Sequence, residues 1–260
     1  MLKAIRARAK QGYRTMKYPA GDPPPLPARF RGLPTIDAEK CATVSKAENG
    51  ACEACVTACP TGAVAPRSID LGACLFCGDC ERACPAHAIS FTKDYRLATS
   101  RREDLVVSAD GGDYARAEAM GRRLLRLLGR SLKLRVVSAG GCNACESDVN
   151  VLTTIGWDLG RFGIQFVASP RHADGILVTG PVTRNMELAL RKTWDAIPGP
   201  KIAIASGSCA ISGGPFAGRP EVLGGMGPTG IPVDLWVPGC PPHPLTILDG
   251  LLRLVGKLEG

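Results

Sequence analysis

The sequence predicts an α+β unit followed by an α/β unit with a parallel, flavodoxin-like sheet. Eight of the twelve cysteines lie in the first half, among short apolar pieces and many turn-forming residues. From residue 133 onward, short apolar strands alternate with helical patterns, which is typical of a parallel sheet covered on both faces. We therefore expect four segments: a basic amphipathic helix and extended arm (1–34), a cysteine-rich unit (35–92), a connector and helix (93–131), and the α/β unit (132–260).

The periodicity of apolar residues places the individual elements of the second half. A helix is expected over 113–129, where leucines and arginines separate onto two sides. The strands of the sheet are expected at 133–138, 163–168, 175–179, 201–205 and 233–237. Helices are expected between and after them, at about 146–157, 184–196 and 243–257.

The cysteine spacing in the first half is the most specific motif of the sequence. Cys74, Cys77, Cys80 and Cys84 are separated by two, two and three residues, and Pro85 follows. Such a run holds a 4Fe-4S cluster in bacterial-type ferredoxins, where the fourth cysteine binds the neighbouring cluster. The segment 35–92 is therefore predicted to be a dicluster ferredoxin-like unit that transfers electrons.

A second run lies upstream, as that pattern requires. Cys41 is followed after ten residues by Cys52, and then by Cys55 and Cys59, with Pro60 next. The insertion after Cys41 departs from the ferredoxin spacing, and its role stays open. Because the last cysteine of each run crosses to the other cluster, we assign one cluster to Cys41, Cys52, Cys55 and Cys84 and the other to Cys74, Cys77, Cys80 and Cys59.

The remaining cysteines follow three predicted strands of the α/β unit. Ligands of such sheets lie beyond the carboxyl ends of the strands, so thiolates from these loops can converge there. Glycine and proline beside them allow a close approach of the backbone. We interpret Cys142, Cys145, Cys209 and Cys240 as ligands of a third 4Fe-4S cluster. The alternative is a structural zinc ion held by four thiolates.

Composition argues against several other functions. The formal net charge of +8 counts every cysteine as neutral, whereas three clusters with their thiolates would lower it to about +2. Aromatic residues make up only 5%, which leaves few rings to stack on bases, so we expect no nucleic-acid binding. No apolar run approaches the roughly 18–20 residues that cross a bilayer, and no apolar signal-peptide core follows the basic start. Cysteines in CxxC groups then indicate metal ligands in a reducing compartment.

Residues 1–18 predict a basic helix with one apolar face. Leu2, Ile5, Ala9, Tyr13 and Met16 recur at steps of three and four, and lysines and arginines occupy much of the remainder. Such a helix either lies on an anionic membrane surface or a membrane partner, or it is a solvated helix packed against partner subunits. The proline-rich segment 19–34 predicts an extended arm.

These motifs resemble a known family. The segments GGCNACESD, RFGIQFVASPRHADGILVTGPVTRN, SGSCAISGG and VPGCPPHP are similar to the small, electron-transferring subunit of membrane-bound nickel-iron hydrogenases of the formate hydrogenlyase and energy-converting type, and to its relative in respiratory complex I. The first half resembles the two-cluster ferredoxin-like subunit of the same complexes, so the chain looks like a fusion. The complex I relatives carry their first two ligands as adjacent cysteines, whereas Cys142 and Cys145 have the hydrogenase spacing.

The resemblance implies an oxidoreductase subunit of hydrogenase type without a complete active site of its own. It implies electron transfer through three 4Fe-4S clusters, between a donor such as a formate dehydrogenase module or a ferredoxin and the nickel-iron site of a separate large subunit. Membrane subunits of the complex would then hold the chain peripherally at the inner, cytoplasmic face of the cell membrane. The alternative is the electron-transfer subunit of a nickel-free, complex I-like quinone oxidoreductase.

Several other side chains invite a functional interpretation. Glu146 and Asp148 are candidates for a proton or interface role, although acids also suit the first turn of a helix. Polar contacts to a partner are the expectation for Arg171 and His172. His87 and His243 each follow a cysteine motif closely. Each is either a hydrogen-bond donor that tunes a cluster or an ordinary surface histidine, and the sequence favours neither alternative. No Ser-His-Asp arrangement or phosphate-binding loop motif occurs in the sequence.

Overall fold

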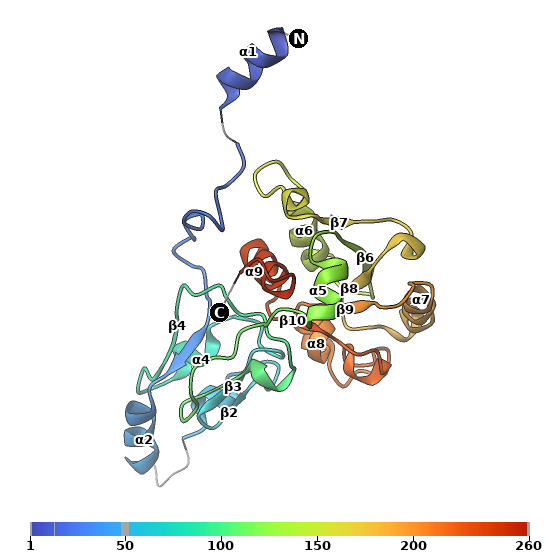
Figure 1. Cartoon of the computed structure of the whole chain (residues 1–260). Coiled ribbons are helices and arrows are strands. Elements are labelled where there is room, and N and C mark those ends of the chain that lie inside the picture. Colours follow the sequence, from blue (N-terminus) through green and yellow to red (C-terminus); the bar gives the residue numbers. More distant parts are fainter. Residues whose placement is uncertain (1, 13, 48–51, 259–260) are drawn as a thin grey trace.

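A five-stranded sheet organises the second half of the chain (Figure 1). The structure, a computed structural model, describes residues 2–12, 14–47 and 52–258. Neighbouring strands of this sheet all run parallel, in the order β10-β9-β8-β6-β7. The strands are β6 (Leu132–Ser138), β7 (Ile164–Phe166), β8 (Gly175–Thr179), β9 (Ile202–Ser206) and β10 (Leu235–Val237).

Numbered along the chain, these strands stand in the order 2-1-3-4-5, the flavodoxin-like arrangement of a doubly wound sheet. The order reverses between β6 and β8, and ligands of such sheets bind at this switch point, outside the carboxyl ends of the strands. The predicted α/β unit with a parallel sheet is therefore confirmed. Its helices are α6 (Ala144–Val151), α7 (Arg184–Asp195), α8 (Ser208–Ser212) and α9 (Pro244–Leu254).

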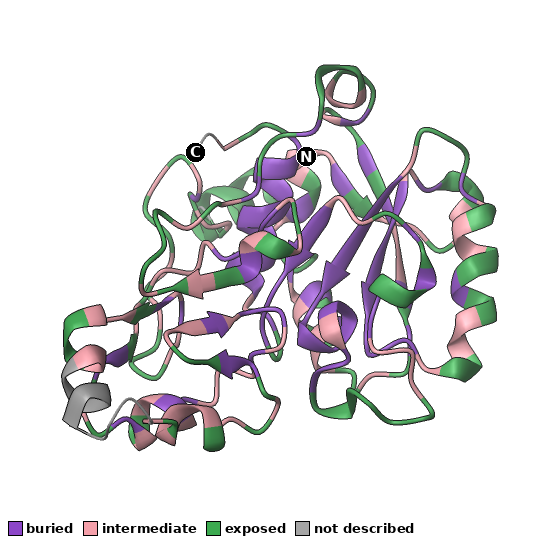
Figure 2. Ribbon diagram, turned by 90° about the horizontal axis from the view of Figure 1, so that it is seen from below, coloured by how far each residue is buried: buried purple, intermediate pink, exposed green. Residues whose placement is uncertain are grey.

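Burial explains the apolar character of the strands. Every residue of β8, β9 and β10 is buried, as expected of strands covered on both faces, and Figure 2 shows the buried sheet between its covering helices. One apolar core joins the sheet to α6 and α9, through residues such as Leu134, Val149 and Leu248. All residues of α9 are buried, including two charged ones.

The second apolar core connects the two halves of the chain. It contains Val178 of β8 and Leu190 of α7 together with Ile69, Leu71 and Leu105 from the first half. The halves therefore share buried side chains and are not joined only by a linker.

The first half contains two small antiparallel sheets with short helices between their strands. β1 (Pro34–Ile36) pairs with β4 (Ile89–Phe91). The second sheet consists of β2 (Val64–Ala65), β3 (Ser68–Asp70) and β5 (Val106–Ser108). The helices are α2 (Ala38–Ala47), α3 (Ala54–Thr57) and α4 (Asp79–Ala83). Single 3-10 turns complete the chain: η1 (Glu103–Leu105), η2 (Leu159–Phe162), η3 (Pro170–His172), η4 (Gly214–Phe216) and η5 (Gly227–Thr229).

An extended arm follows α1 (Leu2–Gln11) and contacts both halves. Near its start, the guanidinium of Arg161 donates to the carbonyls of Met16 (2.5 Å) and Tyr18 (2.7 Å). Toward its end, the ammonium of Lys93 donates to carbonyls of residues 27, 28 and 30. The arm thus ties the first half of the chain to the second.

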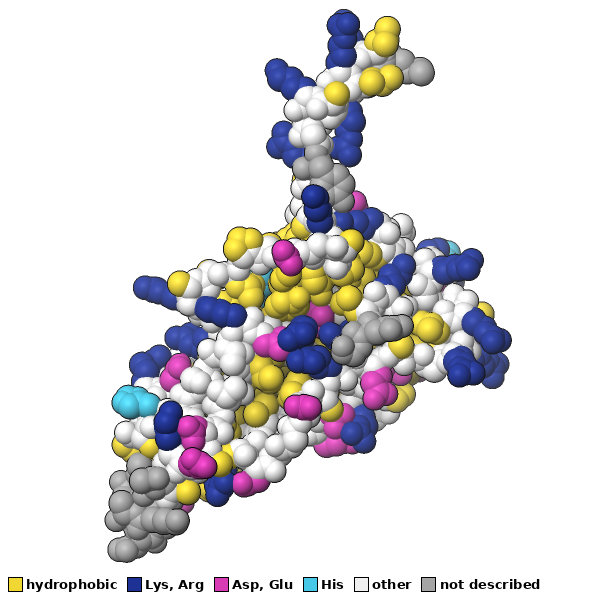
Figure 3. Space-filling view, turned by 60° about the vertical axis from the view of Figure 1, so that its left-hand side comes forward, with side chains coloured by type: hydrophobic (Ala, Val, Ile, Leu, Met, Phe, Trp, Pro, Cys, Tyr) yellow, Lys and Arg dark blue, Asp and Glu magenta, His cyan; other side chains and the backbone are white. Residues whose placement is uncertain are grey.

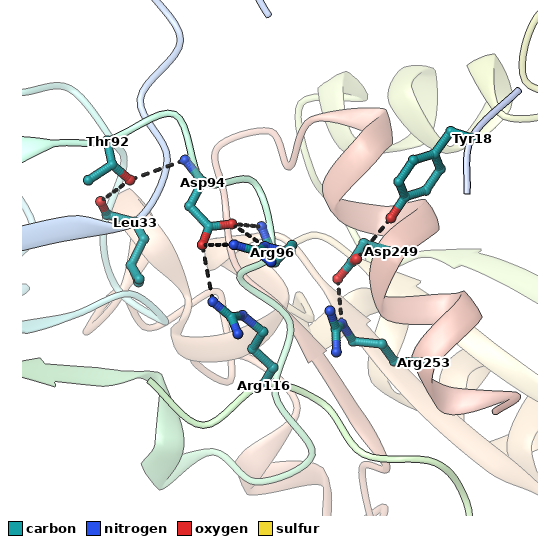
Figure 4. Close-up of polar contacts among 8 residues, drawn as sticks. All are labelled: Tyr18, Leu33, Thr92, Asp94, Arg96, Arg116, Asp249 and Arg253. Carbon is teal, nitrogen blue, oxygen red and sulfur yellow. Dashed lines mark hydrogen bonds and ion pairs between the residues drawn. The ribbon is translucent and has the colours of Figure 1, made fainter. Parts of the chain in front are cut away.

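A buried ion pair holds this arm against α9 (Figure 4). The Asp249 carboxylate accepts hydrogen bonds from Arg253 Nε (2.8 Å) and from the hydroxyl of Tyr18 (3.0 Å). The side chains of Asp249 and Arg253 are only 2% and 5% exposed. Burial raises the pKa of Tyr18, and the neighbouring carboxylate raises it further, so the hydroxyl remains a donor.

The structure corrects two expectations about helices. The helix predicted over 113–129 forms only as α5 (Arg122–Leu128), because backbone amides before it pair elsewhere: Ala117 N donates to Ala98 O and Met120 N to Leu254 O. The helix predicted within 1–18 ends at Gln11, before Gly12, whose φ is +66°. No helix in the described part of the chain is both long enough and apolar enough to span a bilayer.

We expect Asp249→Ala to lower the free energy of unfolding by about 3–5 kcal/mol, because the buried Arg253 guanidinium loses its counter-charge. Urea denaturation of the full chain measures this loss. The matched control is Glu187→Ala, which removes an exposed pair with Arg191 at the same i, i+4 spacing and should cost only about 0.3–0.5 kcal/mol. Equal losses in the two variants would show that burial does not strengthen the Asp249 pair.

Candidate iron-sulfur sites

The first group of cysteines lines one cavity. Residues from α2, the start of α3 and the end of α4 enclose a volume of about 630 Å³, and Cys41, Cys52, Cys55 and Cys84 all contribute to its wall. Burial raises the pKa of the Cys55 thiol, and the other three thiols raise it further. Apolar side chains such as Ile36, Val64 and Ile89 complete the lining. The four cysteines of the first group therefore share one cavity with several apolar side chains.

The second group lies around α4. Burial raises the pKa of Cys74 to about 12, and the neighbouring thiols of Cys80, Cys59 and Cys77 add to this rise. The pKa of Cys80 is raised to about 11 for the same reasons. The structure therefore brings Cys59 from the upstream run beside three cysteines of the downstream run. Thiols crowded in this way cannot all ionise unless cationic metal is bound to them.

Backbone amides point at the sulfur atoms of both groups. Phe76 N donates to Cys74 Sγ at 3.3 Å, Ala63 N to Cys59 Sγ at 3.2 Å, and Ala88 N to Cys84 Sγ at 3.3 Å. Hydrogen bonds of this kind stabilise negative charge on cysteine sulfur and tune the potential of a bound cluster.

The third group lies at the carboxyl edge of the parallel sheet. Cys142 and Cys145 follow β6, Cys209 lies in α8 after β9, and Cys240 follows β10. Burial raises the pKa of Cys145 to about 12, and the thiols of Cys209, Cys240 and Cys142 are among the further causes. Cys142 and Cys240 are exposed, so this group opens to the surface, where a partner can approach it.

Two glycines make room for the third group. Gly207 has φ +95°, and a Cβ there would lie 2.6 Å from Cys145 Sγ. Gly214 has φ +52°, and its Cβ would lie 2.9 Å from Cys209 Sγ. A side chain at either position would enter the space beside a sulfur atom, and positive φ also favours glycine. The backbone is therefore shaped around the thiols.

Among the described residues, no three or more His, Cys, Asp or Glu side chains are arranged so that they could hold one metal ion. Zinc–sulfur bonds are about 2.3 Å long, so four thiolates on one zinc ion must lie within about 4 Å of each other.

Hydrogen bonds join the second and third groups directly. Ser208, next to Cys209, donates to the carbonyl of Cys74 at 2.6 Å. One turn later, Ser212 donates to the carbonyl of Gly72 at 3.0 Å. Neither serine was predicted as a site residue, since a serine beside a cysteine gives no signal of a contact 134 residues away along the chain.

The acidic candidates behave differently from one another. Glu146 is buried and accepts a hydrogen bond from Thr179 Oγ1 at 2.7 Å. Burial disfavours its carboxylate, but donation from Ser138 and Thr179 outweighs this, and the pKa of Glu146 is lowered. Asp148 is half-buried, and burial raises its pKa. Glu146 is thus a charged hydrogen-bond acceptor, and its candidate proton or interface role stays a prediction.

The histidines and Arg171 lie in three different settings. His243 begins α9, where its Nδ1 accepts from Leu245 N at 3.1 Å and its ring packs on Phe30; burial lowers its pKa. His87 is exposed, and Arg171 and His172 of η3 are exposed as well. These three residues keep part of their surface available for contacts outside the chain.

Two family models match the sequence. The model described as NADH ubiquinone oxidoreductase, 20 kDa subunit, matches residues 142–254, which include the third cysteine group. The 4Fe-4S binding domain model matches residues 67–90, which include the run from Cys74 to Cys84. Cysteines 41, 52, 55 and 59 lie outside both matches.

Curated relatives agree with these matches. Formate hydrogenlyase subunit 7 of Escherichia coli (strain K12) is 43% identical over 141 residues, 54% of this chain and 55% of that protein. The probable membrane-bound hydrogenase subunit of Pyrococcus furiosus is 40% identical over 149 residues, 57% of this chain and 89% of that protein. An NADH-quinone oxidoreductase subunit of Heliobacterium modesticaldum is 41% identical over 122 residues, 46% of this chain and 69% of that protein.

The chain spans only about half the length of the first of these relatives but most of the other two. The relatives are named as subunits of hydrogenases and of NADH-quinone oxidoreductases. These relatives and the two matched models show that this chain belongs to the family of the NADH ubiquinone oxidoreductase 20 kDa subunit. It is a complex I-like oxidoreductase subunit that binds 4Fe-4S.

Proposed function

We propose that this chain is the electron-transfer subunit of a membrane-associated, multi-subunit nickel-iron hydrogenase. It would pass electrons through three 4Fe-4S clusters, between a donor and the nickel-iron site of a separate large subunit. The observation that carries the proposal is the arrangement of twelve cysteines in three groups. In each group one thiol, that of Cys55, Cys74 or Cys145, has a pKa raised by burial and by neighbouring thiols. The donor would be a formate dehydrogenase module or a ferredoxin, and membrane subunits would hold the chain at the inner face of the cell membrane.

The proposed ligands follow the three groups. One cluster would be held by Cys41, Cys52, Cys55 and Cys84, a second by Cys59, Cys74, Cys77 and Cys80, and the third by Cys142, Cys145, Cys209 and Cys240. The cavity of about 630 Å³ beside the first group is far larger than a single metal ion needs. Bound there, each cluster would accept and release one electron at a time. The two units in this proposal are residues 35–92, a dicluster ferredoxin-like unit, and residues 132–260.

The residues of this chain have simple tasks in that function. Thiolates would bind the clusters, amides such as Phe76 N donate to the sulfur atoms, and apolar side chains line much of the first cavity. The bond from Ser208 to the Cys74 carbonyl keeps the second and third groups next to each other. The exposed Cys142 and Cys240 leave the third group accessible to a large subunit.

The spacing of Cys142 and Cys145 favours the hydrogenase over the complex I-like alternative. Relatives named as NADH-quinone oxidoreductase subunits are nevertheless similar, at 41% identity. An electron-transfer subunit of a nickel-free quinone oxidoreductase is therefore the second candidate.

Metal analysis separates these candidates. We expect a complex purified anaerobically through this chain to contain about twelve irons per copy of the chain, since three 4Fe-4S clusters hold that number, and about one nickel. The same iron content without nickel would favour the quinone oxidoreductase. Zinc in place of iron would contradict both candidates.

The third site has a test of its own in Gly207→Ala. The added Cβ would collide with Cys145 Sγ, so we expect the loss of about four of the twelve irons and of a corresponding share of visible absorbance. Gly218→Ala is the matched control, because Gly218 also has positive φ (+77°) but nothing within 4 Å of its added Cβ. Unchanged iron in the Gly207 variant, or an equal loss in both variants, would contradict the proposed third site.

A further inference from the structure

Helix α1 buries none of its ten residues against the described part of the chain. Leu2 and Ile5 are 76% and 59% exposed. Its side-chain hydrogen bonds stay local, as in the contact of Arg8 with the carbonyl of Gly12. Figure 1 shows the helix standing away from both halves of the molecule. A helix of this length is only marginally stable in water without tertiary contacts, so it needs a surface outside this chain.

The side chains of α1 are sorted by type around its axis. At about 100° per residue, Leu2, Ile5 and Ala9 share one narrow stripe. Lys3, Arg6 and Lys10 border this stripe on one side and Arg8 borders it on the other; Figure 3 shows basic side chains around the helix and hydrophobic atoms on one side. Cations on both edges of an apolar stripe can reach the same plane as that stripe.

The charge of the N-terminal segment has one sign only. Residues 2–18 contain six lysines and arginines and no acid, and the first acidic residue is Asp22. From Thr15 onward the arm is fixed to the second half, because Thr15 Oγ1 donates to Ile155 O (3.1 Å) and Met16 N to Gly156 O (2.9 Å). A cationic helix is therefore attached to an anchored arm.

We propose that α1 binds the surface of an anionic lipid membrane directly, with its apolar stripe among the headgroups and its cations on lipid phosphates. A protein groove usually takes helices by large apolar anchors over two turns, whereas the third stripe position here is only an alanine. A small apolar area combined with dense cations fits a charged membrane surface. This inference goes beyond the proposed function and does not depend on the cysteines, so its test is independent of metal content.

Vesicle binding of the full chain tests the proposal. We expect co-sedimentation with vesicles that contain phosphatidylglycerol, little binding to pure phosphatidylcholine, and release at high salt, because ions screen exposed charges. Equal binding to both kinds of vesicle would contradict the charge argument.

A pair of triple variants locates the binding surface. Lys3→Gln/Arg6→Gln/Lys10→Gln should weaken binding roughly a hundredfold, since each cation at an anionic surface contributes about fivefold. The control, Arg122→Gln/Arg123→Gln/Arg126→Gln, removes the same charge from the exposed side of α5 and should bind nearly as the parent chain does. Both variants should unfold at the same urea concentration as the parent.

Two results would overturn the proposal. An equal loss of binding in the two triple variants would mean that net charge, and not α1, attracts the chain to lipid. Absence of vesicle binding by the parent chain would contradict the proposal. Loss of a protein subunit from complexes that carry the Lys3, Arg6 and Lys10 substitutions would then assign α1 to a protein partner.

Discussion

Crowded thiols impose the main physical constraint on this molecule. Cys74 and Cys145 each have a pKa raised to about 12, because burial and neighbouring sulfur atoms both disfavour a thiolate. Without bound metal, such groups stay protonated near neutral pH. A cationic iron-sulfur core reverses this preference, since a coordinated thiol is deprotonated. The backbone also accommodates the sulfur atoms, because amides donate hydrogen bonds to them and glycines leave space beside them.

The contact between the two halves brings the second and third cysteine groups together. The shared apolar core places Ile69 and Leu71 with side chains of the parallel sheet. Thr99 of the connecting segment pairs with Trp236 of the edge strand β10, through two backbone hydrogen bonds of 2.9 and 3.0 Å. Ser208 then links the loops of the second and third cysteine groups. Because both units belong to one chain, the distance between them is set when the chain folds and does not depend on the assembly of separate subunits.

The buried ion pair of Asp249 and Arg253 lies where segments distant in sequence meet. The pair of Asp249 and Arg253 would be costly in an apolar core, but the Tyr18 hydroxyl donates a further hydrogen bond to Asp249 and fixes the arm at that point. The Asp94 carboxylate is bound similarly by Arg96 and Arg116 (Figure 4). These contacts hold the arm against α9 and fix the conformation of the connecting segment.

Local sequence determined much of this protein. Alternating apolar strands and helices predicted the parallel sheet, because burial on both faces leaves a continuous apolar run in β8 and β9. The cysteine spacing predicted 4Fe-4S binding, since closely spaced thiols in one loop can reach one cluster. Neither inference needed a contact between distant residues.

Tertiary structure alone decided the rest. The segment 113–121 is not helical, although its residues suit a helix, because Ala117 N and Met120 N find partners in other segments. The strand β5 exists because Ser68 and Asp70 of β3 offer it an edge. Ser208 and Tyr18 gain their roles only from groups more than 100 residues away in the chain. Sequence periodicity indicates which face of an element is apolar. The partner of a buried polar group, in contrast, depends on which distant segment the tertiary fold places beside it.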